Sequence, residues 1–339
     1  MRQILGWTAA RARRRASASA LVVAAAAMVA ACSGIGIPPS PGQEPLVRLY
    51  TSVTQDTVDA VVDVFNAEHA GTEVEVFRAP TGELTARIAA EQREGRIRAD
   101  VLWLTDPLSM QEYDSQALLR TWTPEAAEGI DAAYRSDTFW GTRILNMVIV
   151  TGSEVDPPPA DWADLADPAY QDAVAIPDPG FAGSAFGALG YFALEDAYGF
   201  DYLRDLEANG TVQVQAPDEV TTGVAEGRYQ AGMTLDFSVR QAIENGSPVE
   251  MVWPASGAIA MYTPIAVLTD SDNPAAAEAF VETVLSTDGQ EAIADTGWQP
   301  VREDVAGPPV EGSQVTPDWP AAFDRQEELL EEYRSIFGG

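Results

Sequence analysis

The chain has 339 residues, of which 46% are hydrophobic and 21% charged, a balance typical of folded proteins with about two domains. Its 52 acidic residues outnumber 20 basic ones, all of them arginine, so the formal net charge is −32. A surface this acidic repels phosphate backbones and excludes nucleic acid as a partner. One cysteine and one histidine exclude an internal disulfide and a Cys/His metal cluster, and we expect no metal and no cofactor.

The first residues have the pattern of an export signal. Five arginines and no acidic residue precede an apolar run from Ala20 to Ala31. This run is shorter than the roughly 20 residues that span a bilayer, but its length suits a signal-peptide core. It ends at Val29-Ala30-Ala31-Cys32, and small residues directly before a cysteine resemble the bacterial lipobox.

The lipobox resemblance implies that residues 1–31 are a lipoprotein signal peptide and that Cys32 is lipidated. Ordinary signal cleavage is the alternative, and both Sec and twin-arginine export stay open. The prolines and glycines that follow are typical of a flexible tether, so 32–45 are predicted as the lipidated cysteine and tether. We therefore expect a membrane-anchored lipoprotein that faces outside the cytoplasm.

Beyond the tether, short apolar strands alternate with helices. Strands are predicted at 47–50, 73–77, 100–104, 147–150, 174–176, 212–214, 231–235 and 262–268. Helices are predicted at 58–65, 83–94, from Pro107, at 161–165, from Gly183, and at 219–226, 238–244, 274–285, 289–295 and 319–337. Asp106 is predicted to cap the helix that begins at Pro107, with contact to the ligand as the alternative. This alternation predicts an α/β fold with helix-covered parallel strands and a ligand beyond their carboxyl ends, at 51–54, 79–82 and 105–107.

Several short segments occur together in order and at sensible spacing. They are Leu49-Tyr50-Thr51-Ser52, Ala99-Asp100-Val101-Leu102-Trp103, Pro177-Asp178-Pro179, Gly183-Ser184-Ala185-Phe186, 224–233, 273–280, 289–292 and Gly297-Trp298-Gln299-Pro300-Val301. Over roughly residues 46–305 they resemble the extracellular solute-binding proteins of ABC importers. The nearest branch is the one that holds ferric-ion, thiamine and phosphonate or phosphate-ester binders.

The resemblance implies a two-lobed periplasmic-binding-protein fold of type II. Two mixed sheets with flanking helices would be joined by a two-strand hinge. Lobe 1 would comprise 46–146 plus 263–310, and lobe 2 would comprise 147–262 plus 311–339. Such a protein is a monomer without enzymatic activity, which closes on one small-molecule ligand and delivers it to the membrane permease.

The start of the helix at Gly183-Ser184-Ala185 is a candidate anion site, because free N–H groups and the positive helix end attract anions. In relatives this loop holds carboxylate, carbonate or phosphate oxygens, and Ala182 stands where they often have serine. Capping and tight helix packing are the alternative interpretation.

Ferric ion, the ligand of some relatives, is disfavoured. The positions that match their tyrosine pair are Phe237-Ser238, and Thr54 and Thr105 stand where a His and a Glu occur. Fe(III) needs anionic oxygen ligands, which these side chains do not supply.

The remaining candidate ligand residues are polar or aromatic. Asp236 beside Phe237 suits an ammonium group, with helix capping as the alternative. Arg143, near the first crossing strand, suits an anion, with a surface ion pair as the alternative. Tyr262 is a candidate stacking wall or a core residue, and Thr51, Ser52, Thr54 and Thr105 complete the predicted site.

These residues favour an anion or zwitterion, such as an aminoalkylphosphonate or phosphate ester. Ferric ion, thiamine and polyamines stay open as ligands. A ligand sensor or an enzyme on this fold is the other class, although no Gly-x-Ser-x-Gly motif and no metal-ligand spacing occurs.

Overall fold

The structure is a computed structural model that describes residues 45–338. The predicted signal peptide, the predicted lipidation site Cys32 and all but the last residue of the predicted tether lie outside the described residues. Among those described, no helix is long and apolar enough to cross a membrane.

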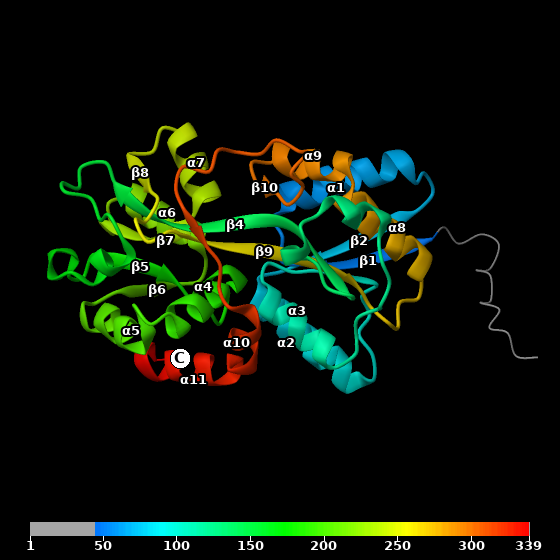
Figure 1. Cartoon of the computed structure of the whole chain (residues 1–339), viewed down its shortest axis with the longest axis horizontal. Coiled ribbons are helices and arrows are strands. Elements are labelled where there is room, and N and C mark those ends of the chain that lie inside the picture. Colours follow the sequence, from blue (N-terminus) through cyan, green and yellow to red (C-terminus); the bar gives the residue numbers. More distant parts are fainter. Residues whose placement is uncertain (1–44, 339) are drawn as a thin grey trace, which may run out of the picture. The chain divides into compact units, whose positions relative to one another are not determined.

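One mixed sheet of eleven strands organises the fold (Figure 1). The order of its main path is β2-β1-β3-β9-β4-β7-β5-β6, with β10 and β8 paired to β4 and β11 to β9. The strands are β1 (Leu46–Thr51), β2 (Glu73–Arg78), β3 (Val101–Trp103), β4 (Phe139–Gly152), β5 (Val174–Pro177), β6 (Val212–Val214), β7 (Ala231–Leu235), β8 (Val249–Val252), β9 (Ala258–Val267), β10 (Gln299–Pro300) and β11 (Gln314–Val315).

Two long strands make the sheet continuous. β4 pairs with β9 from Phe139 to Met147 and with β7 from Met147 to Thr151. β9 in turn pairs with β3 through Ile265 to Val267. The expected two sheets are therefore one hydrogen-bonded sheet here, because β4 and β9 run from its β1–β3 end to its β5–β7 end.

The parallel pairs predicted from the alternation lie at both ends of the sheet. β1 is parallel to β2 and β3, and β5 is parallel to β6 and β7. The carboxyl ends of these strands position the loops that carry the candidate site residues.

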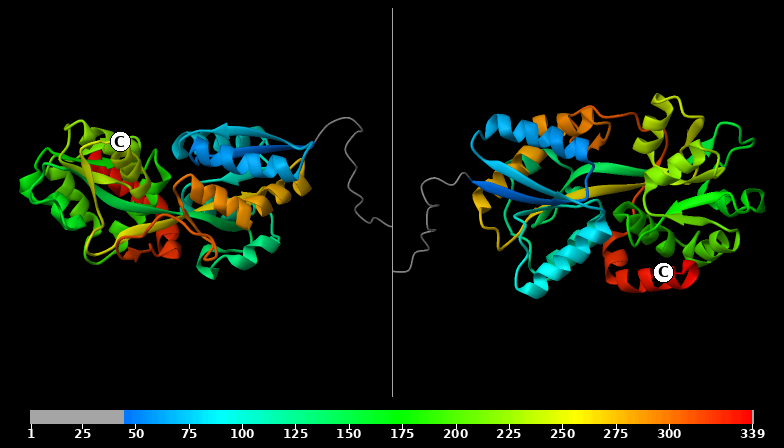
Figure 2. Two further views of the ribbon diagram at one scale, coloured as in Figure 1. Left: turned by 90° about the horizontal axis from the view of Figure 1, so that it is seen from above. Right: turned by 180° about the vertical axis from the view of Figure 1, so that it is seen from behind.

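Helices cover both faces of the sheet (Figures 1 and 2). They are α1 (Gln55–Glu68), α2 (Thr81–Glu94), α3 (Pro107–Ser115), α4 (Gly183–Leu194), α5 (Gly199–Ala208), α6 (Pro217–Ala225), α7 (Asp236–Glu244), α8 (Pro274–Leu285), α9 (Thr287–Asp295), α10 (Trp319–Asp324) and α11 (Gln326–Phe337). Short 3₁₀ helices occur at Glu125–Gly129, Ala132–Tyr134, Trp162–Ala166 and Pro168–Tyr170. α10 packs against α3 and α4, so the end of the chain ties the two ends of the sheet together.

Two predicted helices differ from the structure. The one at 161–165 is a 3₁₀ turn, in which Asp161 and Asp164 form a capping box before Pro168 starts the next turn. The one at 319–337 is divided at Arg325 into α10 and α11. Asp106 caps α3 as predicted and accepts a hydrogen bond from the Ser109 backbone N–H at 2.7 Å.

The core is one large buried cluster with a small satellite. The large cluster includes Val47 and Val101 at one end of the sheet and Ile176 and Leu206 at the other. The satellite packs α6 and α7 on β4 and contains Val148, Val150, Ala175, Val220, Val224, Val239, Val249 and Ala258. Residues 45–338 thus carry every strand of the sheet and their own core.

Candidate functional site

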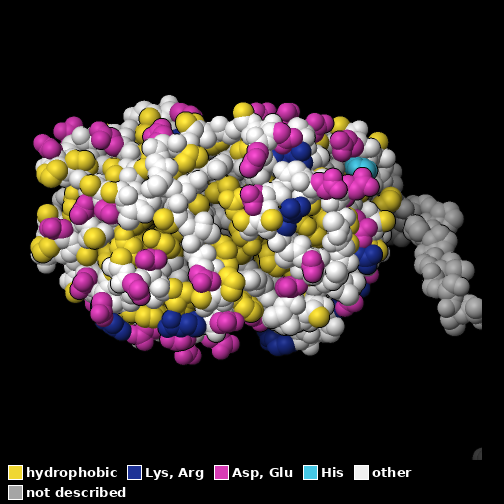
Figure 3. Space-filling view, in the orientation of Figure 1, with side chains coloured by type: hydrophobic (Ala, Val, Ile, Leu, Met, Phe, Trp, Pro, Cys, Tyr) yellow, Lys and Arg dark blue, Asp and Glu magenta, His cyan; other side chains and the backbone are white. Residues whose placement is uncertain are grey.

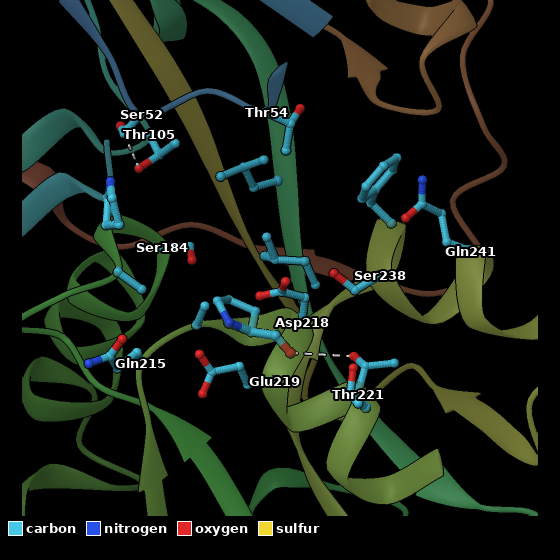
Figure 4. A pocket seen from close by; sticks show the side chains of 18 of the residues that line it. Ser52, Thr54, Thr105, Ser184, Gln215, Asp218, Glu219, Thr221, Ser238 and Gln241 are labelled. Carbon is cyan, nitrogen blue, oxygen red and sulfur yellow. Dashed lines mark hydrogen bonds between the residues drawn. The ribbon is translucent and has the colours of Figure 1, made fainter. Parts of the chain in front are cut away.

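A cavity of about 940 Å³ lies among the carboxyl ends of the parallel strands and the starts of α1, α2, α4, α6 and α7. A volume of this size suits a small organic molecule. Polar side chains line much of it (Figure 4). They include Ser52, Thr54, Gln55, Asp56, Arg78, Thr81, Thr105, Arg143, Ser184, Gln215, Asp218, Glu219, Thr221, Thr222, Glu226, Ser238, Gln241, Asn245 and Ser247.

Hydroxyl groups at the ends of β1 and β3 meet at one edge of the cavity. The Thr105 Oγ1 lies 3.3 Å from the Ser52 Oγ and 2.9 Å from the Thr81 Oγ1. Ser52 follows β1, Thr105 follows β3 and Thr81 begins α2, so three elements each contribute one hydroxyl. Such groups both donate and accept hydrogen bonds, which suits oxygen atoms of a polar ligand.

Arg143 is a buried cation on the wall of the cavity. It lies where the pairing of β4 with β9 shifts register between Gly141 and Ile144, and bulges of this kind redirect side chains. The side chain is among the largest that are fully buried, at 1% exposure. One terminal nitrogen donates to the Thr54 and Thr57 hydroxyls, both at 3.3 Å, while its Nε has no partner. Burial and then the charge of Arg78 lower the pKa of Arg143 to about 9.

Arg78 adds a second positive charge to the same cavity. It ends β2, and its Nε donates to the Val53 carbonyl oxygen at 2.6 Å. Within residues 45–338, neither Arg78 nor Arg143 forms an ion pair with a carboxylate, although acidic residues are abundant. We call these two side chains the arginine end of the cavity.

Phe237 and Trp298 place an aromatic stack behind Arg143. Their ring centroids are 4.2 Å apart with the planes at 17°, and the Arg143 guanidinium carbon lies 4.0 Å from the Trp298 ring. Phe237 belongs to α7, whereas Trp298 lies between α9 and β10. The stack therefore holds one face of the guanidinium and also joins segments from opposite ends of the sheet.

We call the hydroxyls of Ser52, Thr81 and Thr105 the hydroxyl edge of the cavity, and the first turn of α4 lies against it. Gly183 and Ser184 line the cavity, and Ala182 supplies no side-chain cap. A Cβ on Gly183 would lie 2.4 Å from the Asp106 Oδ2 and 2.5 Å from the Thr105 Oγ1. Only glycine allows this close approach, which brings the uncapped N–H groups of α4 to the cavity. Burial raises the pKa of the neighbouring Asp106 to about 6.

Asp218 and Glu219, in the first turn of α6, bring negative charge to another part of the cavity. In Figure 4 they lie together between Gln215 and Thr221, away from Ser52, Thr54 and Thr105. Glu226 also lines the cavity but forms an ion pair with Arg228 at 2.8 Å. We call Asp218 and Glu219 the acidic end of the cavity.

Seven of the eleven predicted ligand residues line the cavity. They are Ser52, Thr54, Thr105, Arg143, Gly183, Ser184 and Phe237.

Four predicted residues lie outside the cavity lining. Thr51 is buried and donates to the Trp103 carbonyl oxygen at 2.7 Å. Ala185 faces a small apolar pocket on the other side of α4. Tyr262 is buried between Tyr134 and Trp319 in the core, as its alternative interpretation stated.

Asp236 is the fourth, and it corrects the expectation of an ammonium site. It is 2% exposed and pairs with Arg240, one turn later on α7, at 2.8 Å. It also accepts hydrogen bonds from the Asn146 side chain at 3.1 Å and the Phe237 backbone N–H at 2.8 Å. The helix begins at Asp236 itself, with Leu235 in the capping position. Its carboxylate is satisfied within the protein.

Arg78 and the acidic end were missed in the sequence. Arg78 lies directly before 79–82, one of the segments where the sequence predicted a ligand beyond a strand end. Its position could therefore have identified it as a candidate ligand residue. Asp218 and Glu219 carried no such signal, because acidic residues are common in the first turn of any helix.

The comparison with family models identifies the family of the chain. A family model described as bacterial extracellular solute-binding protein matches residues 47–299. The spermidine/putrescine-binding periplasmic protein of Escherichia coli is 27% identical over 173 residues, which cover 48% of each chain.

Solved structures share the fold at low identity. The periplasmic binding protein AfuA of Actinobacillus pleuropneumoniae, with fructose-6-phosphate bound, has a TM-score of 0.78 at 20% identity and covers 87% of this chain and 99% of its own. Iron-bound HitA of Pseudomonas aeruginosa has a TM-score of 0.75 at 20% identity, with 86% and 99% covered. These relatives bind a polyamine, a sugar phosphate and iron, so likeness alone leaves the ligand of this chain open.

Proposed function

The chain belongs to the bacterial extracellular solute-binding proteins, the binding components of ABC importers, and we propose that its solute carries a phosphonate or phosphate-ester group. It is a binding protein and not an enzyme. The solute is an anion or zwitterion, such as an aminoalkylphosphonate or a phosphate ester, held in the cavity by its anionic group.

The buried, unpaired Arg143 is the observation that carries this proposal. A buried cation without a counter-ion is unfavourable, and an anionic ligand would satisfy it. Arg78, the hydroxyls of Ser52 and Thr105 and the N-terminus of α4 line the same cavity. Guanidinium groups, hydroxyls and helix N–H groups are the donors that tetrahedral oxyanions prefer.

The other ligands fit this cavity less well. The residues that line it include no tyrosine to hold ferric ion. Asp218 and Glu219 would attract a polyamine or thiamine, but the arginine end would repel any positive charge that reached it. For the enzyme alternative, no group of three or more potential metal ligands occurs in the described part of the chain.

We also propose that the cavity is an interlobe cleft that closes on the solute. Lobe 1 would be 46–146 plus 263–310, lobe 2 would be 147–262 plus 311–339, and β4 and β9 would form the two-strand hinge. Contacts between these lobes support a closed state. The Gly82 N–H donates to the Phe181 carbonyl oxygen at 3.3 Å, and Phe237 stacks on Trp298.

The location completes the proposal. Cys32 would carry a lipid anchor, and residues 33–45 would let a monomeric binding domain reach the permease subunits in the same membrane. A role in sensing instead of transport would use the same cavity with a different partner.

Calorimetric titration of residues 45–339 with 2-aminoethylphosphonate, fructose 6-phosphate, putrescine and ferric citrate tests the ligand class. We expect a phosphonate or phosphate ester to bind, and Arg143→Met to weaken that binding at least thirtyfold, or about 2 kcal/mol. Thermal stability without ligand should not fall, because the variant removes an uncompensated buried charge.

The matched control is Arg204→Met. Arg204 is an exposed arginine of α5 that pairs with Asp201 and Glu332, and none of the three lines the cavity. It should leave affinity unchanged. Binding of putrescine or ferric ion alone, or equal affinity in Arg143→Met, would contradict the proposed anion site.

A further inference from the structure

We propose that Thr57, which does not touch the cavity, is a positioning residue that holds Arg143 in place for the solute. We further infer that Thr54, although it lines the cavity, supports the same arginine instead of donating a hydrogen bond to the solute. The inference rests on the proposed function, because it takes Arg143 as the group that binds the anion.

Three threonine hydroxyls form a chain behind the cavity. The Thr57 Oγ1 lies 2.9 Å from the Thr54 Oγ1 and 3.0 Å from the Thr296 Oγ1. The Arg143 Nη1 donates to both the Thr54 and the Thr57 oxygens at 3.3 Å. Thr57 is fully buried and absent from the cavity lining, so it can act on a solute only through these neighbours.

The single proton of each hydroxyl sets the direction of this chain. Thr296 donates its proton to the Ile293 carbonyl oxygen at 2.7 Å, so Thr57 must be the donor in its contact with Thr296. Thr54 must then be the donor in its contact with Thr57. The two lone pairs of Thr57 therefore accept from Thr54 and Arg143. Thr54 keeps no proton for an oxyanion and offers only lone pairs.

Thr54 also occupies the N-cap position of α1 without capping the helix. A threonine at this position ordinarily accepts a hydrogen bond from a backbone N–H of the first turn, and the Thr54 side chain makes no such bond. Its hydroxyl contacts Thr57 and Arg143 instead. Helix capping therefore does not explain how this side chain is oriented, whereas support of Arg143 does.

The chain gives Arg143 hydrogen-bond acceptors without giving it a counter-ion. It ends at the Ile293 carbonyl in the last turn of α9, where a helix carries partial negative charge. Hydrogen bonds in series polarise one another, which makes the Thr57 oxygen a better acceptor for the guanidinium. Arg143 is thus oriented through Nη1 while its positive charge stays available to an anion.

The test is a double-mutant cycle between Thr57→Val and Arg143→Met, measured by titration of residues 45–339 with 2-aminoethylphosphonate and fructose 6-phosphate. Valine keeps nearly the shape of threonine and removes the hydroxyl. We expect Thr57→Val to weaken binding about five- to tenfold when Arg143 is present, and less than about twofold in the Arg143→Met background. Thr57→Ser keeps the hydroxyl and should restore binding to within about twofold of the wild type.

Thr54→Val separates the two possible roles of Thr54. If its hydroxyl supports Arg143, its removal should weaken binding only when Arg143 is present. A hydroxyl that donated to the solute would be missed in both backgrounds. Thr54 is only half-buried, so this cycle tests the chain even if Thr57→Val is too unstable to measure.

Thr283→Val is the matched control. Thr283 is also buried and absent from the cavity lining, and its hydroxyl donates to Glu68 at 3.1 Å. Its removal should leave affinity unchanged. Wild-type affinity in Thr57→Val, or equal weakening in both backgrounds, would overturn the positioning role and leave the proposed function intact. Failure of both probes to bind the wild type would instead reject the proposed function itself.

Discussion

Arg143 and Asp106 are both fully buried, and among the described residues neither has a partner of opposite charge. Burial shifts each pKa toward the neutral form, lowering that of Arg143 to about 9 and raising that of Asp106 to about 6. Arg143 can gain a counter-ion from the proposed solute. Asp106 gains no counter-ion from the solute, because its oxygens accept hydrogen bonds from Ser109 and its Oδ2 packs against Gly183.

The buried Asp106 predicts a pH-dependent loss of stability. Since its pKa is higher in the folded protein than in the unfolded chain, the folded state binds this proton more tightly. The contribution therefore favours folding below about pH 4 and is lost as the pH rises through about 6, to a total of about 3 kcal/mol. Asp106→Asn should be more stable than the wild type at pH 7.5, and the difference should shrink at pH 4.5.

Urea unfolding of both proteins at pH 4.5, 6 and 7.5 measures this difference. The other acidic groups titrate equally in the two proteins and cancel. Asparagine keeps the oxygen that accepts from the Ser109 N–H, so the cap of α3 is retained. A difference that does not vary with pH would show that Asp106 is not penalised by burial.

At the scale of the element, the start of α4 depends on one glycine. Gly183→Ala should lower the free energy of unfolding by about 1–2 kcal/mol, because the new Cβ would overlap Asp106 and Thr105. Both neighbours are held by hydrogen bonds and cannot move freely. Thermal unfolding, together with titration of the bound phosphonate, measures the effect on stability and on the anion site.

Gly152→Ala is the control for this variant. The nearest atom to a Cβ there is the Val155 Cγ2 at 3.6 Å, which is ordinary contact. Its stability should stay within about 0.5 kcal/mol of the wild type. If Gly183→Ala changed the free energy of unfolding as little, the close approach of α4 to the hydroxyl edge would not require glycine at this position.

The elements also show which features a sequence reveals. The short strands β1, β3, β5 and β7 are apolar runs between turn residues, and pattern alone located them. The first half of β4 was missed because Thr142, Arg143 and Asn146 are polar. All three are buried nonetheless. Partners distant in sequence satisfy Thr142 and Asn146, which bond to Thr263 and Asp236, whereas the Nε of Arg143 has no partner.

Prediction of the site has the same limit, because a sequence pattern does not show which distant side chains come into contact. The loops after β1 and β3 could be placed from strand ends, which is why Ser52, Thr54 and Thr105, predicted from the sequence, lie on the cavity wall. Asp236 was misassigned because Arg240, one turn later on the same helix, was not considered as its partner. Asp218 became a candidate only when the fold brought α6 to the same cavity as Arg143.

At the scale of the whole molecule, acidity is the dominant feature. Figure 3 shows carboxylates spread over one face with few arginines between them. Excess negative charge repels itself in the folded state. Raising NaCl from about 0.05 M to 1 M should therefore raise the melting temperature by roughly 2–6 °C, a gain of about 1–2 kcal/mol.

Calorimetry in NaCl and KCl measures this effect, and equal shifts in the two salts would identify screening as its cause. Glycerol in place of salt serves as a control for non-ionic stabilisation. An unchanged or lower melting temperature would mean that the ion pairs between arginines and acids outweigh the repulsion among the remaining carboxylates.

The position of Arg143, buried inside so acidic a molecule, also bears on how fast a solute is captured. A phosphate dianion diffuses toward a surface that repels it, and the arginines attract it only at short range. The ammonium group of an aminoalkylphosphonate offsets part of the phosphonate charge, so this molecule meets a lower barrier. At low ionic strength the association rate constant should therefore be larger for an aminoalkylphosphonate than for a simple phosphate ester.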